Sequence, residues 1–227
     1  MLPDLGKTTS EVPGEYMPSR HWFAHHLQDL SGVQRARLLL DLNRAVDAVD
    51  SIVEHSEDTP IPGNIGISAA ERAHRCQWLY EPFHRELSRI VDQRLRIGTP
   101  TALLSVHSFT PSYLRSARPW HAGVVSARDR RLADPMLAHL RREPALVVGD
   151  NEPYAAADGV YHTLQRHAEA RGLPSVLLEI RNDQIEHAPG RALWADRLVA
   201  ALRPVIDDLP SPANSFAPID SIGSSTT

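Results

Sequence analysis

Four short runs of nearly continuous apolar residues divide the chain. Within these runs apolar side chains follow one another instead of alternating with polar ones, which is typical of strands that are buried on both faces of a parallel sheet. We therefore expect four buried strands. They cover residues 37–42 (RLLLDL), 102–106 (ALLSV), 145–149 (ALVVG) and 175–180 (SVLLEI).

Amphipathic segments lie between these runs and predict helices. Ser68 followed by Glu71 is a capping box, which predicts a helix that continues to about Leu79. Pro82 either kinks this helix or opens a second one. The apolar spacing predicts further helices at residues 131–141, 160–170 and 191–202. Strands that alternate with helices predict an α/β protein, with a three-layer α/β/α fold around a mainly parallel or mixed sheet.

Polar residues follow each apolar run, at the point where the predicted strand ends. In α/β folds of this kind, ligands bind beyond the carboxyl ends of the strands. We predict that strands 102–106 and 175–180 are parallel neighbours, which brings His107 and Glu179 into one cleft. The rim of this cleft is expected to hold Asn43, Arg44, His107, Ser108, Asp150, Asn151, Glu152, Glu179 and Arg181.

The two ends of the chain differ in composition from its middle. Residues 1–20 and 209–227 carry Gly, Pro, Ser and Thr without apolar periodicity, so neither end can bury enough apolar surface to offset the entropy of ordering it. We expect a flexible N-terminal segment at residues 1–20, a single α/β domain at residues 21–208 and a disordered tail at residues 209–227.

Charge and cysteine content narrow the class of partner. The 24 Lys and Arg residues and 28 Asp and Glu residues leave a net charge of -4, which gives no electrostatic reason to expect nucleic acid or an anionic membrane. No uncharged apolar segment reaches the length of about 20 residues that crosses a bilayer. Cys76 is the single cysteine, which excludes an internal disulfide and favours a reducing, cytoplasmic location. A small-molecule partner is therefore expected, whereas the oligomeric state does not follow from these patterns.

His107 and Arg118 are candidates for a site near the end of the second run. An imidazole at the strand end could ligate zinc or act as a base, but spacing alone favours a histidine that is merely hydrogen-bonded there. Arg118 stands beside a rigid Pro-Trp corner. It suits bidentate binding of a carboxylate, and equally a surface salt bridge.

Glu179 and the pair Asn43-Arg44 are the other candidates. Because Glu179 lies among apolar neighbours, desolvation should make it more basic, which suits general base catalysis; a salt bridge with Arg181 or Arg37 is an equal alternative. The donors of Asn43 and Arg44 could hold a substrate carboxylate, with Arg37 facing an oxyanion. The alternative is an ion pair of Arg44 with the nearby Asp41, which would only hold the turn.

Eight ordered segments of the chain resemble the N-formylglutamate amidohydrolase family in sequence and spacing. Together they cover about residues 37–202, which makes the likeness far more specific than any single motif. The segments are LLLDLNR (38–44), IPGNIGISAAERAHR (61–75), YEPFHREL (80–87), SVHSFTP (105–111), RPWHAGV (118–124), VVGDNEPY (147–154), HAEARGLPSVLLEIRNDQI (167–185) and GRALWADRL (190–198).

The resemblance implies a fold similar to that of zinc-dependent exopeptidases. It also implies a cytoplasmic hydrolase of histidine breakdown, in which zinc-activated water attacks the formyl amide of N-formylglutamate or a similar N-acyl acidic amino acid. On this resemblance His107 is a zinc ligand, Glu179 is the general base and then the acid, and Arg37 assists the oxyanion. Substrate binding falls to Asn43, Arg44, Arg118, Asn151 and Glu152.

The opening that is usual in this family does not stand ahead of Arg37. Family members begin with a strand that ends in an acidic residue, a histidine and small residues, and a later histidine and aspartate complete the metal ligands. A catalytic zinc usually needs three protein ligands. Three explanations stay open. The first is a start that omits the true first strand, which the otherwise intact site favours. The second is that a group such as His21, His25, His26 or Asp29 is recruited as a metal ligand, and the third is a descendant that binds its ligand without turnover.

Two functions other than hydrolysis also stay open. The first is a non-catalytic or truncated family member that binds a small carboxylate ligand, and metal analysis separates it from the enzyme. The second is an interaction protein that works through the tail after Leu209. This interpretation predicts that truncation of the tail leaves hydrolysis untouched.

Overall fold

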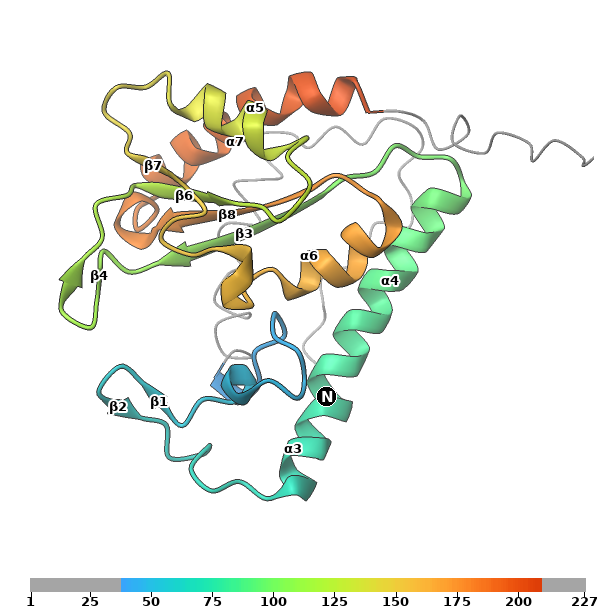
Figure 1. The fold of residues 1–227 in the computed structure, drawn as a ribbon, viewed down its shortest axis with the longest axis vertical. Helices are drawn as coiled ribbons and strands as arrows, with labels where there is room; N and C mark the ends of the chain where they lie inside the picture. Colours follow the sequence, from blue (N-terminus) through green and yellow to red (C-terminus); the bar gives the residue numbers. More distant parts are fainter. Residues whose placement is uncertain (1–37, 210–227) are drawn as a thin grey trace, which may run out of the picture.

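A computed structural model describes residues 38–209 and shows a four-stranded sheet at the centre of the fold (Figure 1). The strands are β3 (Leu103–Phe109), β6 (Ala122–Val125), β7 (Val148–Asp150) and β8 (Ser175–Arg181), in the order β3-β8-β6-β7. The pairs β3–β8 and β6–β7 are parallel, whereas β6 and β8 run antiparallel. The sheet is therefore mixed, within the range of sheets that the sequence predicted.

Helices cover both faces of this sheet. On one face α5 (Ala133–Leu140) and α7 (Ala188–Asp207) bury the larger apolar cluster, to which β6 and β8 contribute Val124, Leu178 and Ile180. The neighbouring side chains of the same strands, Val125 and Leu177, point to the other face. There they pack against Tyr161, which precedes α6 (His162–His167), and against Leu164 within this helix (Figure 1). This alternation along the strands produces the predicted three layers.

A long helical rod leads into the sheet and packs beside α6. It consists of α3 (Ala69–Arg75), the π-helical turn η2 (Cys76–Tyr80) and α4 (Glu81–Arg96) (Figure 1). Ser68 caps α3 as predicted, because its side chain accepts a hydrogen bond from the Glu71 amide at 3.1 Å. Pro82 lies in the first turn of α4, directly after the π-helical turn, so the rod continues through the proline.

The first predicted strand, residues 37–42, is wrong over the residues that the structure describes. Leu38 and Leu39 are helical and turns follow them. Asn64 and Arg75 donate side-chain hydrogen bonds to the carbonyls of Leu38 and Leu39, at 2.8 and 2.9 Å, so these carbonyls are satisfied outside any sheet. The buried Leu40 packs on Ile52 and Tyr80 instead. Of this apolar run, only Leu40 and in part Leu42 join a small separate cluster, whereas Leu38 and Leu39 are exposed.

Strand β6 and the two hairpins are absent from the sequence predictions. The four residues of β6 form a run too short to distinguish from a loop, although all four are buried. The hairpins pair β1 (His55–Ser56) with β2 (Thr59–Pro60), and β4 (Ser112–Tyr113) with β5 (Ser116–Ala117). The remaining elements are the 3-10 turns η1 (Val49–Ser51), η3 (Ala156–Asp158), η4 (Glu169–Arg171) and η5 (Asn182–Gln184).

The other predicted elements are present with shifted ends. The run at residues 145–149 begins pairing only at Val148, since Val147 is 46% exposed. The helix predicted at 160–170 is interrupted at Ala168 and ends at Gly172, whose φ of 66° is left-handed. The helix predicted at 191–202 is longer at both ends.

Within residues 38–209, none of the helices is both long and apolar enough to cross a bilayer. The predictions for residues 1–20, for Arg37 and for the tail after Leu209 concern parts of the chain that lie outside the described residues.

Candidate active site

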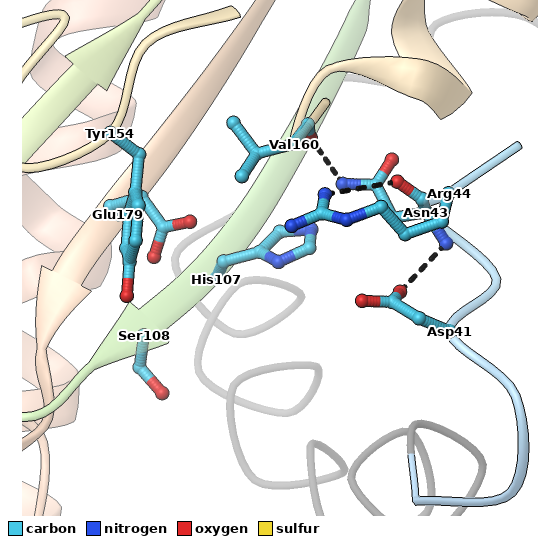
Figure 2. Close-up of a pocket in the computed structure, with 8 residues that line it drawn as sticks. All are labelled: Asp41, Asn43, Arg44, His107, Ser108, Tyr154, Val160 and Glu179. Carbon is cyan, nitrogen blue, oxygen red and sulfur yellow. Dashed lines mark hydrogen bonds between the residues drawn. The ribbon is translucent and has the colours of Figure 1, made fainter. Parts of the chain in front are cut away.

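A pocket opens between the sheet and the loop that follows Leu40. Its empty space, part of which is open to solvent, is ≈ 370 Å³. Three segments approach it from different sides: the ends of β3 and β8, the loop at residues 41–44, and the residues ahead of α6 (Figure 2). The lining consists of Asp41, Asn43, Arg44, His107, Ser108, Tyr154, Val160 and Glu179.

His107 and Glu179 are direct neighbours on the two parallel strands. In the ladder between β3 and β8 their Cα atoms are partners, and both side chains line the same pocket. This confirms the predicted pairing of the strands and the shared cleft. Glu179 is only 4% exposed because β8 is buried along nearly its whole length. The His107 Nε2 atom lies 2.9 Å from Ser105 Oγ, two residues earlier on β3.

The loop opposite the strands is held in place by its own polar groups. The Asp41 amide donates to the Ser51 carbonyl at 2.7 Å, and Asp41 Oδ1 accepts from the Asn43 amide at 2.9 Å. The Asn43 side chain donates to the Val160 carbonyl and accepts from the Thr163 amide at 2.9 Å. Both ends of this amide are thus used to fasten the loop to the start of α6, a role that the sequence did not predict.

Arg44 extends from this loop toward the pocket. Its Nε atom donates to Asp50 Oδ2 at 2.7 Å, so its ion-pair partner is Asp50 and not Asp41, the partner that sequence proximity suggested. The Arg44 side chain is 13% exposed. Figure 2 shows Arg44 and His107 pointing toward one another across the pocket. The Arg44 guanidinium and the His107 imidazole therefore face each other across the pocket.

Arg118 lies behind the pocket wall instead of lining it. Its Nη1 atom donates to the Tyr154 hydroxyl at 2.9 Å, and Tyr154 lines the pocket. The guanidinium also packs over the rings of Phe109, Tyr113 and Tyr154, 5.7, 4.7 and 5.0 Å from their centroids. These aromatic faces hold the cation in place while leaving part of its hydrogen-bonding edge available.

Asn151 and Glu152 do not belong to the lining. Asn151 Oδ1 accepts from the Ser126 amide at 3.0 Å, which ties the end of β7 to the end of β6. The Glu152 carbonyl presses against the glycines Gly123 and Gly149, where an added Cβ would lie 2.0 and 2.4 Å from that oxygen. Both residues thus shape the loop beside the site, and their predicted contact with substrate stays a prediction.

Asp41, Tyr154 and Val160 are lining residues that sequence reasoning did not assign to the pocket. Asp41 belongs to the run that was interpreted as a strand interior. Tyr154 directly follows the polar residues DNEP, which were predicted in part to lie at the rim, and this position in the sequence could have indicated that it lines the pocket. Val160 carries no chemistry, and only its carbonyl contact with Asn43 reveals its place.

The part of the chain that the structure describes offers few ligands for a metal ion. Within residues 38–209, no three His, Cys, Asp or Glu side chains gather as a metal site. His107 is the single predicted zinc ligand in that part of the chain, and Arg37, His21, His25, His26 and Asp29 lie outside it. A catalytic zinc usually takes three protein ligands, so the described residues by themselves do not fit one.

Known proteins resemble this chain in sequence and fold. The family model of N-formylglutamate amidohydrolases matches residues 20–186. The structure of a gene product from Agrobacterium tumefaciens is 38% identical, with a TM-score of 0.70, and the match covers 75% of this chain and 68% of that one.

The structure of N-formylglutamate amidohydrolase from Ralstonia eutropha JMP134 is similar in fold, at 17% identity and a TM-score of 0.57, over 81% of this chain and 82% of that one. Among curated proteins none matches the sequence. Since the family model spans most of the chain and the likeness extends through the pocket residues, this protein belongs to the N-formylglutamate amidohydrolase family.

Proposed function

We propose that the protein is an amide hydrolase that removes the formyl group, or a similar small acyl group, from an N-acylated acidic amino acid such as N-formylglutamate. Membership of the family supports the class of reaction. The single observation that carries the assignment to this pocket is the pairing of His107 with Glu179 on adjacent parallel strands, opposite Arg44.

Glu179 is the proposed proton carrier. Its carboxylate is buried at the inner end of the pocket, where it can take a proton from the attacking water and deliver it to the leaving nitrogen. The water oxygen bonds to the formyl carbon, the carbon–nitrogen bond breaks, and formate and the free amino acid are the products. Arg37 is proposed to face the developing oxyanion, as the resemblance implies, and it lies outside the described residues.

The two arginines beside the pocket support an anionic, dicarboxylic substrate. Arg44 lines the pocket from the loop side, whereas Arg118 lies behind Tyr154 and donates to its hydroxyl. A guanidinium binds a carboxylate through two parallel hydrogen bonds. An acidic N-acyl amino acid carries two carboxylates; Arg44 is placed to bind one of them directly, and Arg118 adds positive charge nearby without lining the pocket.

We further propose that the enzyme uses zinc, with His107 as one ligand. The support is the family resemblance together with the place of His107 in the pocket. Elemental analysis of the purified chain tests the proposal. About one zinc per chain is expected if residues outside 38–209 complete the ligand set, whereas a chain that carries no metal but hydrolyses N-formylglutamate would contradict it.

A formate-release assay tests the hydrolytic function. The wild-type protein should release formate from N-formylglutamate, and Glu179→Gln should lower kcat by about 10²- to 10⁴-fold, because a neutral amide cannot accept the proton from water. Glu186→Gln is a matched control on an exposed residue beyond β8. Circular dichroism should show that both variants fold. Equal rates in wild type and Glu179→Gln would remove Glu179 from the mechanism.

A carboxylate-binding protein without turnover is the second candidate. It is favoured by one observation, the lack of a three-residue metal group within residues 38–209. Calorimetry with glutamate combined with the formate-release assay distinguishes the two candidates, because the binding protein should bind glutamate while releasing no formate from any N-formyl amino acid. Loss of that binding in Arg44→Ala would place the ligand in this pocket.

A further inference from the structure

Two buried histidines lie directly behind the loop that carries Asn43 and Arg44. His84 on α4 is 2% exposed and His167 on α6 is 0% exposed. Their rings stack at 11°, with centroids 5.0 Å apart. Neither residue lines the pocket, yet His84 Nε2 lies 3.0 Å from the carbonyl oxygen of Leu42, the residue before Asn43.

The hydrogen bonds of the two rings admit one arrangement of protons while both are neutral. A carbonyl oxygen only accepts, so His84 Nε2 must carry the proton that it donates to Leu42. A neutral imidazole has one N–H, so His84 Nδ1 accepts, and His167 Nε2 donates to it across 2.7 Å. His167 Nδ1 then accepts from the Ser88 hydroxyl at 3.2 Å. The result is a directed row of hydrogen bonds from Ser88 to the Leu42 carbonyl.

Burial, together with nearby charges, keeps both rings neutral at physiological pH. Burial is the main cause that lowers the pKa of each to about 4, and the nearby Arg166 guanidinium adds to the effect. The charged and titratable groups that face the pair are Arg166 and His162 on α6, Arg171 on η4, Asp92 on α4 and Tyr80 on η2. Asp92 opposes the lowering at His167, and the hydrogen bond to the Leu42 carbonyl opposes it at His84. A neutral pair is the state that the directed hydrogen bonds require.

The same loop is fastened again one residue further along, this time to the start of α6. Asn43 binds the Val160 carbonyl and the Thr163 amide, next to the start of the helix that carries His167. Leu42 and Asn43 are thus both anchored, and Arg44 is the next residue. The Arg44 amide itself donates to the Asp41 carbonyl at 3.2 Å, so the backbone that leads into Arg44 is held at three successive residues.

We propose that His84 and His167 are positioning residues for substrate binding: through the Leu42 carbonyl they hold the loop so that Arg44 faces the pocket. The inference rests on the proposed function in one respect, namely that Arg44 binds a substrate carboxylate. It goes beyond that function by assigning a role to two side chains that touch neither substrate nor solvent.

Nitrogen-15 NMR of histidine-labelled protein tests the hydrogen-bond row without any ligand. At pH 7 both rings should show the neutral Nε2–H tautomer, with Nδ1 unprotonated. Each signal is assigned by its loss in the corresponding histidine variant. A protonated ring, or an Nδ1–H tautomer at either position, would overturn the proposed arrangement.

His84→Phe tests the effect on the site, because it keeps a ring and removes the donor to Leu42. The KM for N-formylglutamate should rise about 3- to 10-fold, the scale of one hydrogen bond, with kcat little changed. His84→Gln, whose amide N–H can reach the same carbonyl, should restore most of the affinity. His74→Phe removes a histidine whose side chain is 69% exposed on α3 and should leave KM unchanged.

The outcomes separate this inference from the proposed function. If the wild type releases no formate, backbone amide shifts of Asn43 and Arg44 carry the test, and they should move in His84→Phe but not in His74→Phe. If His84→Phe does not fold, Ser88→Ala replaces it, and the His167 Nδ1 signal and KM should both change. Unchanged loop signals, or a loss of kcat at constant KM in a folded variant, would refute the positioning role.

Discussion

The guanidinium of Arg44 faces two environments. On one side it pairs with Asp50, whose side chain is 52% exposed, and on the other it borders the pocket. An ion pair with an exposed partner contributes little free energy, because water screens it. The pairing with Asp50 therefore leaves Arg44 donors that are suited to a ligand carboxylate.

Arg44→Ala should weaken binding of an acidic ligand by about 1.5–3 kcal/mol, the usual contribution of hydrogen bonds to a charged group. Isothermal titration with glutamate measures the change. Asp50→Ala is the matched control, since it removes the partner and keeps the guanidinium. Affinity in that control should stay the same or increase, because a negative charge near the ligand is lost. Unchanged affinity in Arg44→Ala would refute the role of this residue.

The residues of the site differ in how far they could be predicted from sequence. His107 and Glu179 stand at the ends of apolar runs, and strand ends in α/β folds meet at one rim, so their neighbourhood could be expected. The partners of Asn43 could not, because they lie 117 and 120 residues further along the chain. An amide can bind a ligand or a backbone equally well, and only the distant contact decides which.

At the scale of elements, the close approach of the loop after β7 to the paired strands β6 and β7 depends on two glycines. Gly123 and Gly149 are register partners on these parallel strands. The Glu152 carbonyl lies where a side chain at either position would begin. The absence of Cβ atoms allows the loop after β7 to fold back over the strands, and this loop leads to the lining residue Tyr154.

Gly123→Ala should lower the free energy of unfolding by about 1–3 kcal/mol, because the added methyl group overlaps a backbone oxygen that cannot rotate away. Urea denaturation measures the difference. Gly63→Ala is the matched control, since a Cβ at Gly63 meets nothing within 4 Å. Equal stability of the two variants would show that the loop after β7 moves aside at little cost.

At the scale of the whole molecule, two histidines are buried where α4 and α6 meet. Their pKa values, lowered to about 4 chiefly by burial, differ from the ordinary value of 6.5 that they regain on unfolding. The unfolded chain therefore binds more protons than the folded one between these values. The stability linked to His84 and His167 is fully present above pH 6.5 and is lost as the pH falls toward 4.

Between pH 7.5 and 5 the free energy of unfolding should decrease by about 2 kcal/mol for each buried histidine, from the difference in pKa between the two states. Urea denaturation at both pH values measures the decrease. His167→Phe should show a smaller decrease than wild type, and His74→Phe should show the same one, since His74 is exposed. A stability that does not change over this interval would show that both rings bind protons alike in the folded and unfolded chain, so that burial does not lower their pKa values.

The sequence by itself determined the fold class, the pairing of β3 with β8, the cap of α3 and the family, because each depends on local periodicity or on residues that stand at strand ends. Only the tertiary structure decided that residues 38–42 leave the sheet, that β6 runs antiparallel to β8, and that Asn43 anchors a loop. The physical reason is the same in all three cases. Apolar burial and hydrogen-bond satisfaction can be met by any suitable partner, and the partners here come from distant parts of the chain.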